Sequence, residues 1–206
     1  MIERKRLRAA FSLTLIGLLA ALLLAGIDRL TAERIARAQQ QRALATLVAL
    51  LPAGSFDNEL IEDHVDLPIS RLVQPARVYR ARLEGEPAAL IFDVTTGQGY
   101  SGDIRLLVVM DPDGVLLGVR VLDHRETPGL GDKIEVERSD WIRQFTGRSL
   151  GNPPAEGWRA DRRGGAFDTL TSATITTDAV IEAVRLSLEE KSQRPDRLWQ
   201  AADPES

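Results

Sequence analysis

The stretch IRLLVVMDPDGVLLGVRVL, residues 104–122, decides the class of fold. Its first part, residues 104–110, is apolar except for Arg105, which is typical of a strand buried on both faces. The DPDG sequence at 111–114 favours a tight turn, because aspartate, proline and glycine accept the backbone conformations that such a turn requires. Residues 115–122 then predict the returning strand. The sequence therefore predicts a hairpin of two antiparallel strands.

Two more strands are predicted before this hairpin. Residues 77–83, RVYRARL, alternate apolar and basic side chains, as a strand with one exposed face does. Residues 88–94 are mostly apolar and predict a second strand. Residues 52–75 hold prolines, glycines and scattered acids, so we expect a loop there.

Helices are predicted on the C-terminal side of the strands. Residues 135–145 have a helical pattern, and we expect Ser139 or Asp140 to restart this helix before Trp141. Residues 179–191 predict an amphipathic helix. Its apolar stripe consists of Val180, Ala183, Val184 and Leu188. The predicted fold class is therefore α+β, with a mainly antiparallel sheet and flanking helices.

The N-terminus has the composition of a membrane anchor. Residues 9–27 are 19 consecutive uncharged residues, and a helix of that length spans about 28 Å, close to the hydrocarbon thickness of a bilayer. Four basic residues lie in the segment 1–8, so the positive-inside rule places that segment in the cytoplasm. A cleaved signal peptide is the alternative, but its apolar core would have only about 7–15 residues.

The rest of the chain is expected on the far side of the membrane. Residues 28–51 repeat apolar side chains at helical spacing up to Pro52, which predicts a stalk helix that continues the membrane helix. Residues 52–192 then form one globular domain, and the polar residues 193–206 form a loose tail.

The composition excludes several classes of function. The 206 residues include no cysteine, which excludes disulfides, thiol catalysis and iron–sulfur ligation by this chain. A net charge of −4 and an aromatic content of 5% argue against nucleic-acid binding. The two histidines lack metal-ligand spacing and no G-x-S-x-G motif occurs, so neither a metal site nor a serine hydrolase is predicted.

Two glycine-rich stretches are candidates for a ligand-binding site. Residues 97–102, GQGYSG, contain three glycines, which would let a ligand approach the backbone closely; the alternative is a flexible hairpin loop. Residues 126–133, ETPGLGDK, hold a leucine between two glycines, suited to contact with a planar apolar ring. The alternative for this second stretch is a loop that leads into a helix.

A third stretch, residues 168–177, carries six hydroxyl side chains in ten residues directly before a predicted helix. Hydroxyl groups and free backbone N–H groups at the start of a helix can bind an anion. The alternative is simple capping, although one cap needs only one hydroxyl. The stretch has neither the glycines nor the lysine of a nucleotide P-loop.

Together these stretches resemble one known family. Residues 99–135, followed by SDWIRQFTG at 139–147 and FDTLTSATIT at 167–176, are similar to the G subunit of the Rnf/Rsx ion-translocating electron-transport complex. The C subunit of the sodium-translocating NADH:quinone reductase is a more distant relative. The similarity covers nearly the whole chain, including the anchor, and is strongest over residues 97–184.

The resemblance implies FMN joined through its phosphate to a threonine hydroxyl by a flavin transferase. The family pattern is Asp, two residues, Ser or Thr, Gly-Ala-Thr, any residue, and then the modified threonine, which here is Thr176. The matching positions are Asp168, Thr171, Ala173, Thr174 and Thr176. Ser172 stands where the family usually has glycine, and if that backbone needs a positive φ, a serine costs about 1–3 kcal/mol.

The resemblance also assigns residues around the flavin. We expect Leu130 to pack on the flavin ring and residues 99–102 to form another wall of the site. Thr174 competes with Thr176 for attachment, because residues two apart in an extended segment face the same side, and only the family pattern favours Thr176. The predicted cofactor-binding residues are Gly99, Tyr100, Ser101, Gly102, Glu126, Thr127, Pro128, Gly129, Leu130, Gly131, Asp168, Thr171, Ser172, Ala173, Thr174 and Thr176.

The function that the resemblance implies is electron transfer by a flavin-carrying subunit of a redox-driven ion pump, with ions moving through its partner subunits. The implied location is the bacterial inner membrane, with the main domain in the periplasm. The implied partners are the other membrane and peripheral subunits of the complex, the flavin transferase and membrane lipid. The alternative is a non-redox, membrane-anchored assembly or sensor subunit whose flavin site has lapsed.

Overall fold

The computed structural model describes Leu51, residues 54–195 and residues 197–200, together with six single positions between Thr14 and Gly26. The chain divides into two compact units, Met1–Ala45 and Thr46–Ser206. Apart from those positions, the predicted cytoplasmic segment, membrane helix and stalk helix lie outside the described residues. Among the residues that are described, no helix has the length and apolar character needed to cross a membrane.

The second unit is built on one sheet of five strands. The strands are β1 (His64–Leu67), β2 (Ala76–Leu83), β3 (Glu86–Thr96), β4 (Ile104–Met110) and β5 (Leu116–His124). They lie side by side in chain order, and every neighbouring pair is antiparallel. The predicted hairpin is confirmed, since Met110 of β4 pairs with Leu116 of β5 across the turn.

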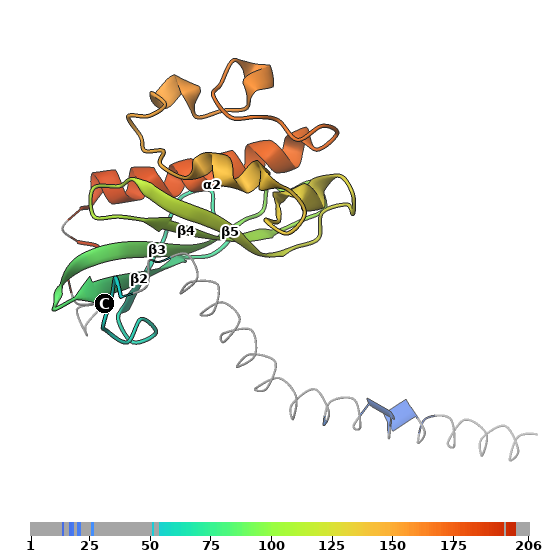
Figure 1. Ribbon diagram of the computed structural model, residues 1–206. Coiled ribbons are helices and arrows are strands. Elements are labelled where there is room, and N and C mark those ends of the chain that lie inside the picture. Colours follow the sequence, from blue (N-terminus) through green and yellow to red (C-terminus); the bar gives the residue numbers. More distant parts are fainter. Residues whose placement is uncertain are drawn as a thin grey trace, which may run out of the picture. The chain divides into compact units, whose positions relative to one another are not determined.

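One long helix, α2 (Thr174–Gln193), lies across one face of the sheet (Figure 1). Its predicted apolar stripe is buried, and Val180 and Val184 join Leu106 and Val108 of the sheet in the core. Burying a side chain of this size contributes about 1.5–3 kcal/mol. The predicted α+β class with an antiparallel sheet is therefore confirmed.

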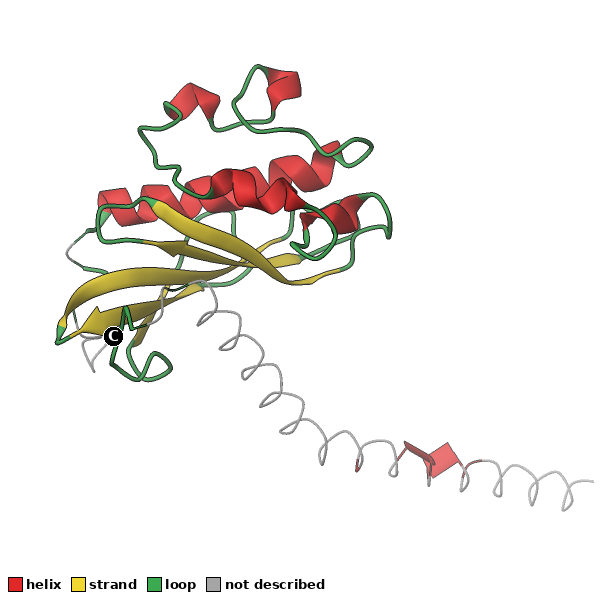
Figure 2. Ribbon diagram, in the orientation of Figure 1, coloured by secondary structure: helices red, strands yellow, loops and turns green. Residues whose placement is uncertain are grey.

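Four short 3₁₀ helices lie between β5 and α2, on the same side of the sheet as α2 (Figure 2). They are η1 (Gly131–Ile134), η2 (Asp140–Phe145), η3 (Ala155–Gly157) and η4 (Asp161–Arg163). An aromatic cluster holds this segment to the core, because Phe145 stacks on Phe167 at 4.9 Å and Trp158 lies 4.8 Å from the same ring. The cluster fixes the chain immediately before Asp168.

The helix predicted over residues 135–145 is wrong as a single element. The structure has η1 before this range and η2 within it, separated by residues 135–139, the last of which, Ser139, is extended with φ −161°. The Ser139 hydroxyl accepts a hydrogen bond from the Trp141 N–H, so the predicted restart at this serine is confirmed. The loop predicted over 52–75 also needs correction, because it contains β1, an edge strand too short to show alternation.

Helix α2 begins at Thr174, five residues before the predicted start at Ala179. Thr177 explains the early start, because its hydroxyl donates to the Ala173 carbonyl and accepts from the Leu170 N–H. These bonds stabilise the first helical turn, although its hydroxyl and β-branched residues favour a loop when judged from the sequence alone. The extended segment predicted around Thr174 and Thr176 is therefore wrong.

The tail predicted to be loose from Gln193 onward packs on the sheet as far as Gln200. Leu198 is fully buried, and the Arg82 side chain of β2 donates to the Trp199 carbonyl at 2.7 Å. The Arg82 guanidinium also lies 5.5 Å from the centre of the Trp199 ring. These contacts tie the end of the described chain to strand β2.

Candidate functional site

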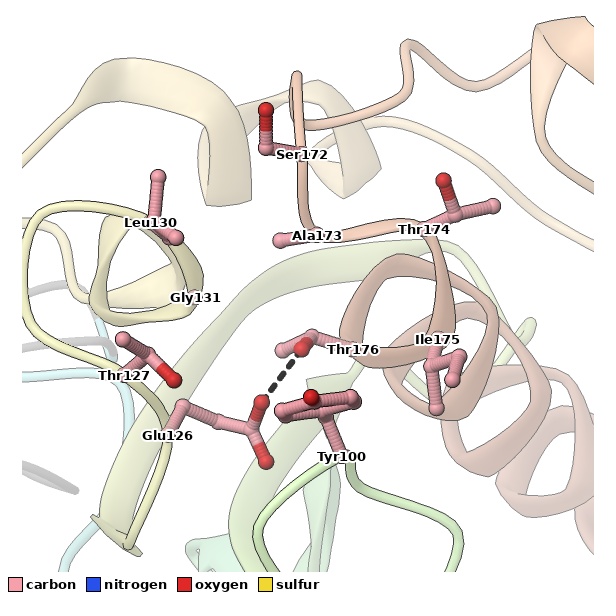
Figure 3. A pocket seen from close by; sticks show the side chains of 10 residues that line it. All are labelled: Tyr100, Glu126, Thr127, Leu130, Gly131, Ser172, Ala173, Thr174, Ile175 and Thr176. Carbon is pink, nitrogen blue, oxygen red and sulfur yellow. Dashed lines mark hydrogen bonds between the residues drawn. The ribbon is translucent and has the colours of Figure 1, made fainter.

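The three stretches singled out in the sequence meet at one cavity of about 520 Å³ (Figure 3). This volume lies within the range of about 300–1,000 Å³ that is usual for cofactor and ligand sites. The residues that line it are Tyr100, Glu126, Thr127, Leu130, Gly131, Ser172, Ala173, Thr174, Ile175 and Thr176. The prediction that these distant stretches form a common site agrees with this arrangement.

Glu126 joins the walls of the cavity. Its side chain is only 5% exposed, and it accepts hydrogen bonds from the Ser101 N–H at 3.0 Å and from the Thr176 hydroxyl. The Glu126 N–H donates to Nδ1 of His124 at 2.9 Å, so Nε2 of His124 is the nitrogen that donates to Glu135. Through its carboxylate and its backbone N–H, Glu126 thus connects the glycine-rich turn after β3, the first turn of α2 and the end of β5.

Thr176 and Thr174 face different directions. Both lie in the first turn of α2, where two positions along the helix correspond to a rotation of about 200°. The Thr176 side chain is 1% exposed and points toward Glu126, whereas the Thr174 hydroxyl points away from it (Figure 3). The expectation that the two hydroxyls share one side is wrong because the segment is helical.

Two glycines allow the walls to close around Glu126. A Cβ atom on Gly99 would lie 2.3 Å from the Gly102 carbonyl oxygen and 2.8 Å from Oε1 of Glu126. A Cβ atom on Gly131 would lie 2.8 Å from Cβ of Glu126 and 3.2 Å from the Thr176 hydroxyl oxygen. A larger residue at either position would displace the carboxylate or the backbone next to it.

Exposed apolar side chains from three parts of the chain gather at the rim of the cavity. Leu130 is 41% exposed, Ile175 52% and Tyr100 67%. The turn that carries Leu130 is fixed, because the Thr127 carbonyl accepts the N–H groups of Leu130 and Gly131. Apolar groups that converge on a cavity while exposed to solvent are typical of a binding surface.

The start of α2 combines strain with unused hydrogen-bond donors. Ser172 has φ +68°, which confirms that this position adopts a positive φ and that the serine there is strained. Ala173 occupies the N-cap, and no side chain caps the helix. None of the nearby hydroxyls therefore serves as a cap, and N–H groups of the first turn remain available to an anion.

Comparison with known proteins agrees with this geometry. Residues 99–189 match the family described as the FMN-binding domain. The chain is 41% identical over 199 residues to the G subunit of the ion-translocating oxidoreductase complex of Pseudomonas aeruginosa (strain UCBPP-PA14), covering 95% of this chain and 93% of the relative. A protein of the same name from Haemophilus influenzae (strain Rd) is 42% identical, covering 87% of each chain. One from Pseudoalteromonas atlantica is 43% identical over 75% of this chain and 74% of the relative.

The chain belongs to the family of G subunits of ion-translocating oxidoreductase complexes. The resemblance inferred from the sequence is confirmed, and so is the assignment to a subunit of a redox enzyme complex. The FMN-binding domain contains every residue that lines the cavity, because the match begins at residue 99 and ends at 189.

Several residues predicted to bind the cofactor do not line the cavity. Asp168 and Thr171 are exposed, and the backbone of Asp168 is held between the Gln144 amide and the Trp141 indole. Ile175 lines the cavity but was not predicted, although its position between Thr174 and Thr176 was a signal. The remaining predicted positions that do not line it are close in sequence to lining residues: Gly99, Ser101, Gly102, Pro128 and Gly129.

Proposed function

We propose that this protein is the flavin-carrying electron-transfer subunit of a redox-driven ion-translocating complex, with FMN attached through its phosphate to Thr176. The observation that carries the proposal is the Thr176 hydroxyl, which lies in the cavity of an FMN-binding domain between exposed apolar side chains. Homologues named as subunits of an ion-translocating oxidoreductase complex support the same role.

The cavity suits the two chemically different ends of FMN. The isoalloxazine ring is flat and largely apolar, so Tyr100, Leu130 and Ile175 at the rim are suited to flank it. The phosphate is anionic, and the uncapped start of α2 next to Thr176 offers N–H donors to it. A helix N-terminus stabilises a neighbouring negative charge by about 0.3–1 kcal/mol.

When bound, FMN supplies the redox chemistry by accepting and releasing electrons. The roles of the protein are to hold the ring at the rim, to anchor the phosphate, and to keep the cofactor from leaving. The rim side chains are 41% to 67% exposed, which would leave a ring among them accessible to the redox centre of a partner subunit. A covalent bond suits a domain outside the cytoplasm, where no local synthesis replaces a lost cofactor.

The proposed setting is a bacterial inner membrane, with residues 9–27 as a single transmembrane helix and the flavin domain in the periplasm. The apolar run 9–27 and the basic residues before it support this orientation. The other subunits of the complex, membrane lipid and a flavin transferase are the proposed partners. A reporter active only outside the cytoplasm, fused after Ser206, should be active; activity of a cytoplasm-only reporter at that position would contradict the orientation.

A second candidate function is a non-redox assembly or sensor subunit with a lapsed flavin site. The observation that favours it is Ser172, a strained non-glycine residue at φ +68° beside the attachment segment. Strain of this kind costs about 1–3 kcal/mol, which is compatible with a folded loop. The hydroxyl of Thr176 and the cavity are both intact, so electron transfer remains the better-supported function.

The flavin spectrum separates these two candidates. The full chain should be produced together with an active flavin transferase, purified, denatured and freed of small molecules. The electron-transfer proposal predicts that the yellow flavin absorption stays with the polypeptide. A colourless polypeptide, obtained while the transferase modifies a known acceptor in the same cells, would support the lapsed site.

A further inference from the structure

The Thr176 hydroxyl is already hydrogen-bonded to a proton acceptor. It donates to Oε2 of Glu126, and the two side chains are 1% and 5% exposed. Among the described residues that line the cavity, Glu126 is the only carboxylate; the other oxygen-bearing side chains are hydroxyls or the phenol of Tyr100. An alcohol becomes a better nucleophile when an adjacent base can take its proton. Glu126 is therefore placed to activate Thr176.

Neighbouring groups fix the carboxylate in this position. The Ser101 N–H donates to Oε1 of Glu126 at 3.0 Å, which leaves Oε2 directed at Thr176. A Cβ atom on Gly131 would lie only 3.0 Å from Oε2, so the glycine permits this placement. Within the described part of the chain, Glu126 forms no ion pair that would occupy the carboxylate.

We propose that Glu126 is the general base for covalent attachment of the flavin. This inference rests on the proposed attachment at Thr176. The FMN phosphate is a monoester without a good leaving group, so the donor must be an activated flavin of the dinucleotide class. Such a donor carries a nucleoside monophosphate joined to the FMN phosphate through an anhydride bond.

In this step Oγ1 of Thr176 attacks the phosphorus atom of the FMN half of the donor. The Oγ1–P bond forms while the anhydride P–O bond breaks, and nucleoside monophosphate leaves with the bridging oxygen. The hydroxyl proton passes to Oε2 of Glu126 and is then released to solvent. The product is a phosphodiester between the flavin and Thr176, and nothing is oxidised or reduced.

The same contact accounts for selection between the two threonines of the first turn. The Thr174 hydroxyl also borders the cavity, but it points away from Glu126 (Figure 3). Among the described residues, no carboxylate in the lining of the cavity faces it. Glu126 therefore acts as a base for one hydroxyl and not for the other.

The test is the rate of flavin transfer to purified full-length protein in detergent, with purified transferase and flavin adenine dinucleotide as donor. Intact-protein mass spectrometry measures the adduct over time. Glu126→Gln keeps the size of the side chain and an acceptor oxygen but removes the base, so the rate should fall about 100-fold or more. Glu156→Gln is the matched control, because Glu156 is exposed and lies outside the cavity lining, and its rate should equal that of the wild type.

A second variant distinguishes a base from a structural support. Glu126→Ala leaves space where the carboxylate lay, and added acetate should restore part of the transfer rate, whereas acetamide of the same shape should not. Circular dichroism checks that both variants fold. A Glu126→Gln rate within about threefold of the wild type, or equal rescue by acetamide and acetate, would overturn the role of Glu126 and leave the proposed function standing. If the wild type accepts no flavin while the same transferase modifies another acceptor, both the role of Glu126 and the proposed function are overturned.

Discussion

The interface between the sheet and α2 and the wall of the cavity both include residues of α2, but their side chains differ in kind. The interface consists of apolar side chains such as Val108 and Val184, fully buried and supported by regular hydrogen bonding. The wall contains a buried carboxylate, a helix start without a cap and a serine at φ +68°. Each of these wall features reduces stability, whereas each residue of the interface increases it.

This difference indicates what each region has been selected to do. Features that cost stability tend to persist where they serve a binding or chemical role. The cavity wall would be more stable with glycine at 172 and with a capping side chain at 173. We therefore expect substitutions in the interface to change stability first and substitutions in the wall to change flavin loading first.

The largest effect on stability is expected in the core. Phe92 of β3 is fully buried, and Phe92→Ala should lower the free energy of unfolding by about 3–5 kcal/mol. Urea unfolding followed by circular dichroism measures this loss, and flavin loading should fall only as far as folding does. A loss below about 1 kcal/mol would show that the interface does not dominate stability.

The sharpest effect on flavin loading is expected at Gly131. Gly131→Ala would place a methyl group 2.8 Å from Cβ of Glu126 and 3.2 Å from the Thr176 hydroxyl oxygen. We expect the covalent flavin content to fall about tenfold or more, while the free energy of unfolding falls by only about 1–3 kcal/mol. Gly151→Ala is the matched control, since a Cβ atom there has no neighbour within 4 Å.

If Gly131→Ala lowers stability but leaves flavin content unchanged, the close contact at this glycine matters only for folding. If Gly151→Ala lowers flavin content as much, the effect of Gly131→Ala does not depend on Glu126. Either result would remove the distinction between the wall and ordinary loops.

A smaller effect is expected in the turn that presents Leu130. Gly129 has φ +79°, a conformation that a β-branched residue strongly resists, although a Cβ atom would meet no neighbour within 4 Å. Gly129→Val should therefore shift the turn, and we expect slower reduction of the bound flavin in stopped-flow measurements while the domain stays folded. Parallel loss of folding and flavin reactivity would instead support a purely structural turn.

The smallest effect is expected at Ser172. Ser172→Gly relieves the positive φ, and the free energy of unfolding should rise by about 1 kcal/mol. Covalent flavin content should stay equal or increase, as thermal unfolding and absorbance of the denatured protein would show. If the free energy of unfolding and the flavin content both decrease, the serine side chain stabilises the loop by more than its backbone strain costs.

The sequence predicted the sheet well because strand signals are local. Residues 104–110 are apolar except for Arg105, and the observed β4 has the same bounds. The short strand β1 was missed because four residues at a sheet edge carry no clear periodicity. The buried tail was missed for a related reason, since Leu198 and Trp199 are two apolar residues in a polar segment and their packing depends on tertiary contacts with β2.

The sequence predicted which segments form the candidate site, but not how their side chains are arranged. Composition singled out the three stretches, and the resemblance joined them at one flavin. The roles of Glu126 and Thr176 depend on a hydrogen bond between residues 50 positions apart, which no local pattern reveals. The early start of α2 also depends on the bonds of Thr177, and it is this helical turn that separates Thr176 from Thr174.

The measurement that tests the central claim most directly is the mapping of the flavin by peptide mass spectrometry, after production of the chain with an active flavin transferase. We predict a single adduct of the mass of FMN less one water on Thr176. It should be absent from Thr176→Ala, and Thr174→Ala should still carry flavin on Thr176, though less efficiently if the loop moves. An adduct on Thr174, or flavin retained covalently by Thr176→Ala, would contradict the account.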